Sequence, residues 1–165
     1  MEMDRRTAGE YALSVFRILV GWLFLWPFFD KVFGLGFQTP DGSGAVDGGS
    51  PSSFVIYVTD GHFADFYVSI AGNAFVDFLF VTALLILGIT LILGIASRLT
   101  TAGSILFFLV MYTLCIPPQD NPVIDYHIIL CVGMVVVYCL GGFERLSLHG
   151  RWSELSLVRR FPILQ

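Results

Sequence analysis

Four stretches of the chain are long, apolar and nearly free of charge: residues 11–29, 78–96, 99–116 and 123–143. The second and third stretches contain no charged residue, and the first contains only Arg17. A helix needs about 20 mainly apolar residues to cross a hydrocarbon core roughly 30 Å thick. Because the stretches are continuous, they lack the alternation that a membrane β-barrel requires. The pattern therefore predicts four transmembrane helices, over residues 11–33, 74–97, 99–116 and 123–143.

The first apolar stretch is predicted to be a retained helix. Arg17 interrupts it, and no small-x-small cleavage site of a signal peptide follows it.

The longest connection, residues 34–73, is predicted to lie outside the membrane. Its first half is rich in Gly, Pro, Asp and Ser, which favours tight turns, with disorder as the alternative. Apolar residues then recur with helical spacing at Phe63, Phe66, Tyr67 and Ile70. This spacing predicts a short amphipathic helix that lies on the outer membrane surface and covers the bundle like a lid.

Composition supports a membrane protein. Of 165 residues, 56% are hydrophobic and 13% are charged, which is more apolar surface than a soluble domain of this size can bury. The net charge of −4 argues against nucleic acid as a partner. The lipid bilayer is the partner that this composition predicts.

The basic residues predict the orientation of the helices. They fall in the N-terminal segment, between the second and third stretches, and in the tail 144–165: Arg5, Arg6, Arg98, Arg145, Arg151, Arg159 and Arg160. The opposite loops carry mostly acids: Asp41, Asp47, Asp60, Asp65 and Asp120, with Lys31 nearby. The positive-inside rule therefore places both termini in the cytoplasm. The fold class predicted is all-α, a polytopic four-helix membrane bundle, N-in and C-in.

Metal and dithiol chemistry are not predicted. Cys115, Cys131 and Cys139 show no C-x-x-C spacing, and the three His residues lie on different segments. We expect the cysteines to be buried packing residues and expect no metal site.

Polar residues gather at the predicted outer ends of the helices. Asp30 and Lys31 end the first helix, Asp77 lies one turn inside the second, and Asp125 and His127 begin the fourth. We expect all five at one depth. Ionisable residues in a membrane commonly mark functional sites.

Arg17 lies nearer the cytoplasmic end and has two interpretations. Its long side chain can extend to the lipid headgroups, or it can face inward and pair with an acid or a substrate anion.

Asp125 and His127 also have two interpretations. Two residues apart on a helix, they would point about 200° from one another, so we expect them not to share a small pocket. In one interpretation Asp125 caps its helix and pairs with Lys31, while His127 bonds a loop carbonyl. In the other, the acid and the imidazole relay protons to a quinone. Trp22 and Trp26 would wall the quinone pocket, or they are interfacial anchors.

Three segments resemble the DoxX/DoxD family of four-helix membrane proteins. They are "RILVGWLFLWPFFDKVFGLGF", "SIAGNAFVDFLFVTALLILGITLILGIASRL" and "IPPQDNPVIDYHIIL", and the likeness covers roughly residues 14 to 152. The combined pattern is R-x(3)-G-W with a later D-K, A-G-N-x-x-V-D, an Arg closing the second helix, and N-P-x-x-D-x-H. Its polar positions here are Arg17, Asp30, Lys31, Asn73, Asp77, Arg98, Asn121, Asp125 and His127.

The resemblance implies a subunit of a thiosulfate:quinone oxidoreductase in the cytoplasmic membrane of a prokaryote. In that family a smaller DoxA partner assists the transfer of electrons from thiosulfate to quinone. The chain shows no DoxA-like segment, so a second subunit would have to supply it. The alternative is a non-catalytic accessory or assembly subunit of a larger membrane complex. A homo-oligomer also remains open, because small residues on the helices favour close packing of either kind.

The candidate residues follow from both lines of reasoning. Asp125, His127 and Asp77 are the catalytic candidates, of which an acid would carry protons to the quinone. Lys31, Asp30 and Arg17 are the substrate-binding candidates, with Lys31 holding thiosulfate and protonated His127 assisting.

Overall fold

The computed structural model describes residues 4–59, 61–118 and 121–165. Across these ranges the chain is helical and contains no strand. Two acids counted in the charge pattern, Asp60 and Asp120, lie outside the described residues.

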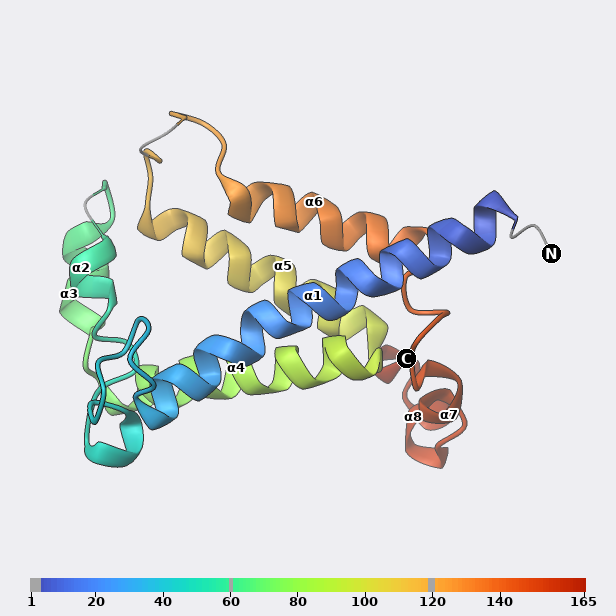
Figure 1. Cartoon of the computed structure of the whole chain (residues 1–165), viewed down its shortest axis with the longest axis horizontal. Helices are drawn as coiled ribbons and strands as arrows, with labels where there is room; N and C mark the ends of the chain where they lie inside the picture. Colours follow the sequence, from blue (N-terminus) through green and yellow to red (C-terminus); the bar gives the residue numbers. More distant parts are fainter. Residues whose placement is uncertain (1–3, 60, 119–120) are drawn as a thin grey trace.

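Four long helices run side by side (Figure 1). They are α1 (Arg5–Phe33), α4 (Ala74–Leu93), α5 (Ser97–Leu114) and α6 (Tyr126–Cys139). α1 packs along α4 and α6 packs along α5, while α1 also contacts α6 and α4 contacts α5. α1, α4 and α5 are long and apolar enough to cross a membrane, whereas α6 is apolar but has only 14 residues.

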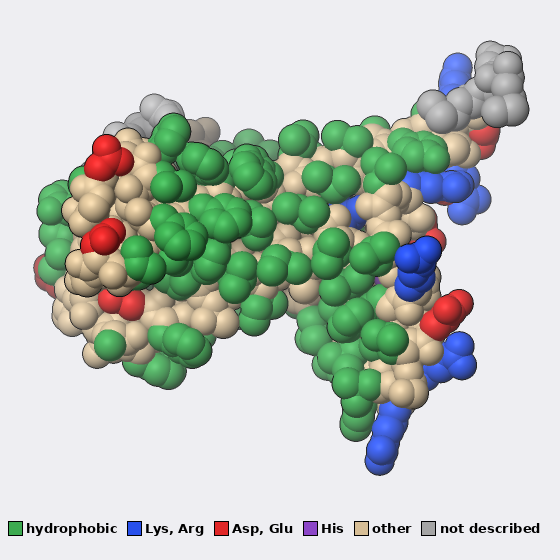
Figure 2. All heavy atoms as spheres, turned by 60° about the horizontal axis from the view of Figure 1, so that its bottom comes forward, with side chains coloured by type: hydrophobic (Ala, Val, Ile, Leu, Met, Phe, Trp, Pro, Cys, Tyr) green, Lys and Arg blue, Asp and Glu red, His purple; other side chains and the backbone are tan. Residues whose placement is uncertain are grey.

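The interior of this assembly is apolar and rich in aromatic side chains. Phe24 of α1 lies at its centre, with ring centroids 5.0 Å from both Phe107 and Phe108 of α5. Leu91 of α4 and Met134 of α6 are fully buried in the same cluster. The outer faces of the helices are also apolar (Figure 2). A surface of this kind requires hydrocarbon around it, so the predicted bilayer environment is supported.

The helix boundaries differ from the prediction. The first helix was predicted over residues 11–33, but α1 begins at Arg5. The second and third helices were expected to meet at residues 97–99, but α4 ends at Leu93 and α5 begins at Ser97. Between them, Gly94 and Ala96 adopt left-handed conformations with φ of 65° and 49°. Asn73 caps α4 as its position suggests, because its side chain accepts from the backbone N–H of Phe75 at 2.9 Å.

The fourth helix is shorter than the predicted span 123–143. Asp125 caps α6, so the helix begins only at Tyr126, and a left-handed Gly141 at φ 82° follows its end. The 14 residues rise about 21 Å, which is less than the roughly 30 Å of a hydrocarbon core.

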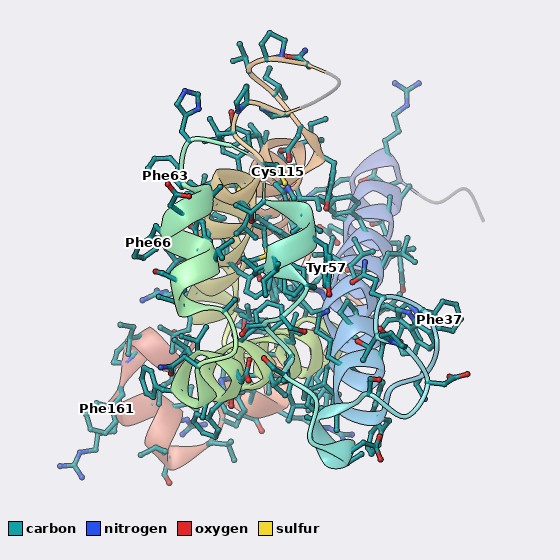
Figure 3. The ribbon with its side chains drawn as sticks, turned by 90° about the vertical axis from the view of Figure 1, so that its left-hand side faces the viewer. Phe37, Tyr57, Phe63, Phe66, Cys115 and Phe161 are labelled. Atoms are coloured by element: carbon teal, nitrogen blue, oxygen red, sulfur yellow. The ribbon has the colours of Figure 1, made fainter. Side chains whose placement is uncertain are left out.

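The connection 34–73 is partly helical. It contains the 3-10 turn η1 (Ala45–Asp47), α2 (Val55–Val58) and α3 (Ala64–Ile70), and the last of these is the short helix predicted from the apolar spacing. α2 and α3 stand across one end of α4 and α5 (Figure 1). Tyr67 reaches inward and its hydroxyl lies 2.5 Å from the hydroxyl of Thr113. Phe63 and Phe66 point away from the helices (Figure 3).

The opposite end of the molecule holds the C-terminal part of the chain. It consists of α7 (His149–Ser153), α8 (Ser156–Arg160) and the 3-10 turn η2 (Pro162–Leu164). The beginning of α1 lies at this same end (Figure 1).

α1 and α4 approach one another closely at two glycines. A Cβ atom on Gly88 would lie 3.0 Å from the backbone N of Leu25 and 3.2 Å from the carbonyl oxygen of Gly21. Small residues permit such contacts between membrane helices, where packing drives association.

Replacing Gly88 with alanine is therefore expected to push α4 away from α1. The nearest atom to that Cβ is Leu25 Cδ1 at 2.8 Å, which a rotamer change can move, but the two backbone atoms cannot move in this way. We therefore expect a loss of about 1–3 kcal/mol. Thermal unfolding of the purified chain in mild detergent measures it. Gly9→Ala is the matched control, because a Cβ there meets nothing within 4 Å.

Candidate functional site

Arg17 is fully buried and bonds only to backbone oxygens among the described residues. Its Nε donates to the carbonyl of Gly142 at 2.9 Å, and one Nη donates to the carbonyl of Leu146 at 2.8 Å. The other Nη donates to the carbonyls of Leu91 and Ile92 near the end of α4. Carbonyls at a helix end lack helical partners, so a buried guanidinium can satisfy them.

The position of Arg17 decides between its two interpretations. The side chain is fully buried and faces inward, so of the two interpretations the extension to the lipid headgroups is wrong. Its partners are carbonyls rather than an acid, and they join α1 to the ends of α4 and α6. A role for Arg17 in substrate binding stays a prediction.

Asp30 is buried at the other end of α1 and organises the loop that follows. Its carboxylate accepts from the backbone N–H groups of Phe37, Gln38 and Thr39 at 3.2, 3.1 and 2.8 Å. Three N–H donors satisfy one buried carboxylate and hold the loop against α1.

Lys31 is 3% exposed and lies under the residues that precede α2. Its Nζ sits 4.2 Å from the centroid of the Phe54 ring, a cation–π arrangement. No ion pair of Lys31 occurs within the ranges that the structure describes, so the expected pairing with Asp125 is absent there.

Asp77 bonds the connection 34–73 to the first turn of α4. Its carboxylate accepts from the hydroxyl of Ser50 at 2.9 Å and from the backbone N–H of Ser52 at 2.8 Å. The hydroxyl of Ser52 in turn accepts from the backbone N–H of Gly72. Asp77 and Asp30 therefore shape the connection 34–73 from two helices.

The side chains of Asp125 and His127 contact one another at the start of α6, and both are largely buried. His127 Nδ1 lies 2.6 Å from Asp125 Oδ2, with side-chain exposures of 9% and 13%. The other oxygen of Asp125 accepts from the backbone N–H groups of His127 and Ile128 at 2.9 and 3.3 Å. One carboxylate thus caps the helix and orients the imidazole.

The expectation that Asp125 and His127 cannot share a pocket is wrong. It assumed helical spacing between them, but Asp125 is the cap residue, with extended φ and ψ of −125° and −175°. From that conformation the carboxylate turns back over the first turn of α6 and reaches the imidazole. Among the described residues, the ring of His127 bonds Asp125 and not a loop carbonyl.

A row of aromatic rings connects Lys31 with His127 through the helix assembly. The Phe54 ring stacks on Phe80 at 5.4 Å, and Phe80 stacks on Phe107 at 5.8 Å. Phe107 contacts Phe108 at 6.4 Å, and Phe108 lies 6.4 Å from the His127 ring. Lys31 and His127 therefore stand at opposite ends of a row of aromatic rings.

Trp22 and Trp26 lie together on α1, at 6.0 Å between ring centroids. Phe37 of the following loop packs edge-on against Trp26 at 4.8 Å, and Figure 3 shows Phe37 at the outer side of that loop. Trp22 is 49% exposed on the outer face of the helices. Neither indole contacts His127 among the ring contacts of the described residues.

A cavity of about 510 Å³ opens between α4 and α5, below α2 and α3. Its walls are formed by carbon atoms and include Phe80, Phe107, Leu106 and Tyr67. This volume falls in the range of roughly 300–1,000 Å³ typical of small-molecule sites. The lining suits a hydrocarbon chain better than a polar headgroup.

The structure thus divides the predicted polar group into three separate arrangements. Asp30 and Asp77 hold loops, Lys31 lies against an aromatic ring, and Asp125 joins His127. Sequence reasoning missed Phe54, which covers Lys31 and lines the cavity. It also missed Ser50 and Ser52, although their place in a Ser-rich turn before an apolar helix suggests side-chain caps.

Cysteine positions correct a further expectation. Cys131 is buried and its thiol faces the carbonyl of Ile105 at 3.6 Å, but Cys139 is exposed on the outer side of α6. Among the described residues, no three His, Cys, Asp or Glu side chains are grouped to hold a metal ion.

Comparison of the chain with models of known protein families, with curated proteins and with solved structures found no match. The resemblance to the DoxX/DoxD family therefore stays a prediction from the sequence motifs.

Proposed function

We propose that this chain is a DoxX/DoxD-like membrane subunit that helps to pass electrons from thiosulfate to quinone. The observation that carries the proposal is the covered Asp125–His127 pair at the start of an apolar helix. Ionisable side chains are costly to place in membrane helices, and their presence there commonly marks proton transfer. The motif resemblance supplies the substrate class.

The proposed topology has four crossings with both termini in the cytoplasm. The arginines at the end that holds α7 and α8 support this orientation through the positive-inside rule. The short α6 would cross the bilayer together with the apolar residues on either side of it.

The reaction requires both an electron donor site and a proton source. Two thiosulfate anions each lose one electron and join through a new S–S bond as tetrathionate. A quinone gains those two electrons and two protons and becomes a quinol. The resemblance implies a smaller DoxA partner, and we assign thiosulfate oxidation to such a second subunit.

The contribution of this chain is proton delivery to the quinone oxygens. His127 Nδ1 is occupied by Asp125, which leaves Nε2 as the nitrogen that can give a proton. Asp125 fixes the tautomer and the orientation of the imidazole.

Lys31 is proposed to attract the anionic donor, but only after the segment around Phe54 moves. In the structure the ammonium is covered by that ring. We expect Lys31→Met to raise the thiosulfate concentration that gives half-maximal rate without changing the maximal rate. If membranes that carry the variant reach half-maximal rate at the same thiosulfate concentration as the unmodified chain, Lys31 does not attract thiosulfate.

The proposal is tested in membranes of cells that lack the chain and are supplied with it again. Thiosulfate is added and the formation of quinol is followed by absorbance. Restoration of thiosulfate-dependent quinol formation by the chain supports the proposal. Equal rates with and without the chain, at equal levels of the partner subunit, would contradict it.

A second function, an accessory subunit of a larger membrane complex, is favoured by a different observation. Arg17, Asp30 and Asp77 direct most of their hydrogen bonds at backbone groups of the chain itself. Such residues hold a fold together without performing chemistry. This alternative predicts that activity of the complex survives any substitution that preserves packing.

A further inference from the structure

The C-terminal segment, residues 145–165, is held firmly against the ends of α4 and α5. The backbone N–H of Leu148 donates to the carbonyl of Leu93 at 2.8 Å. The backbone N–H of Arg98 donates to the carbonyl of Gln165 at 3.0 Å. Val158 is 1% exposed and serves as the apolar contact of α8. The segment is therefore a fixed part of the fold.

This segment projects sideways from the end of the helices (Figure 1). Several large apolar side chains of the segment are exposed: Leu155 at 49%, Leu157 at 60%, Phe161 at 47% and Ile163 at 59%. In Figure 2 the hydrophobic side chains of this part gather on the side turned toward the middle of the helices. If α1, α4 and α5 cross a bilayer, its hydrocarbon core surrounds them, and that side of the segment faces this core.

Basic side chains stand at the outer edge of the same part (Figure 2). Arg151, Arg159 and Arg160 are exposed, and none forms an ion pair within the part of the chain that the structure describes. Glu154 is the one acid between residues 145 and 165. The guanidinium groups therefore keep their donors available for a phosphate.

We propose that the C-terminal segment is an interfacial anchor that embeds its apolar side in one leaflet and binds anionic phospholipid headgroups through Arg151, Arg159 and Arg160. The apolar side would face into the bilayer and the arginines would face the headgroups, which is the arrangement that an interfacial helix requires. The Arg160 guanidinium lies 5.6 Å from the centroid of the Phe161 ring, so its side chain would extend along that ring toward the headgroups. A soluble partner protein would instead need this face turned away from the membrane. The proposal stands independently of electron transfer.

The depth of the apolar side is measured first. The full chain with Cys139→Ser carries a nitroxide on Leu157→Cys or on Arg151→Cys, in bilayer discs of phosphatidylcholine and phosphatidylglycerol. The chain without an introduced cysteine gives the background signal. We expect the label at 157 to be relaxed by oxygen and the label at 151 by an aqueous nickel chelate. Equal access of the chelate to both labels would overturn the proposal.

The charge preference is measured on matched variants. Arg159→Gln with Arg160→Gln is compared with Arg5→Gln and Arg6→Gln, an adjacent pair at the same end but outside the segment. Mass spectrometry of the detergent-purified full chain gives the ratio of phosphatidylglycerol to phosphatidylcholine retained. We expect the C-terminal variant to lower this ratio several-fold and the N-terminal variant to lower it less. A loss as large in the N-terminal variant would overturn the binding of headgroups by this segment.

Discussion

Replacing Arg17 with leucine is expected to remove at least about 3 kcal/mol from the stability of the helix assembly. The substitution removes the hydrogen bonds from the guanidinium to the carbonyls of Leu91, Gly142 and Leu146. Two of these carbonyls keep another donor, the Gly94 N–H for Leu91 and the Ser14 hydroxyl for Gly142. Hydrogen bonds to a charged group contribute about 1.5–3 kcal/mol each. Unfolding of the purified chain in detergent, followed by circular dichroism against denaturant, measures the loss.

Two further variants separate the hydrogen bonds of Arg17 from its charge. Arg17→Lys keeps the charge but cannot reach three segments at once, so we expect an intermediate loss. Arg98→Leu is the control, because the Arg98 side chain is exposed and donates only to Pro162 among the described residues. If Arg17→Leu were no more destabilising than Arg98→Leu, the guanidinium would not hold the helix ends together.

Replacing Asp125 with asparagine is expected to lower thiosulfate-dependent quinol formation by about 10²- to 10⁴-fold, the range of general acid–base catalysis. The amide oxygen still caps α6 through the N–H groups of His127 and Ile128. The carboxylate oxygen beside Nδ1 is replaced by an amide group, so the imidazole loses the acceptor that fixes its tautomer and orientation. Quinol formation is compared at equal protein levels and equal thermal stability.

Asp77→Asn is the matched control for this loss. Its carboxylate also lies at the outer end of a helix, but it bonds Ser50 and Ser52 and no titratable side chain among the described residues. We expect its quinol formation to stay within a factor of a few of the unmodified chain. Full activity of Asp125→Asn would support the accessory-subunit alternative instead.

The membrane helices were predictable because the bilayer imposes one length and one composition. Residues 74–97 and 99–116 differ from α4 and α5 by a few residues, since left-handed conformations at Gly94 and Ala96 have no signal in an apolar run. The short α3 followed from spacing alone. The shortened α6 was missed because Asp125 was counted inside the helix and not as its cap.

The polar positions were predictable as a group, but their partners were not. Sequence spacing placed Asp30, Lys31, Asp77 and Asp125 at one end of the helices, where the structure also has them. It could not foresee that loop N–H groups would occupy Asp30 or that Phe54 would cover Lys31. Those contacts depend on the path of the connection 34–73, which turn residues do not determine.

The central claim is that this chain works on a membrane quinone together with a second subunit. The most direct test is to purify the tagged chain from its native membranes in mild detergent and to identify its proteins and quinones by mass spectrometry. The proposal predicts a small DoxA-like protein and roughly one quinone per chain, with the quinone reduced when thiosulfate is added. Recovery with a large unrelated complex and without quinone would contradict it and would make the Asp125–His127 pair a structural element of an accessory subunit.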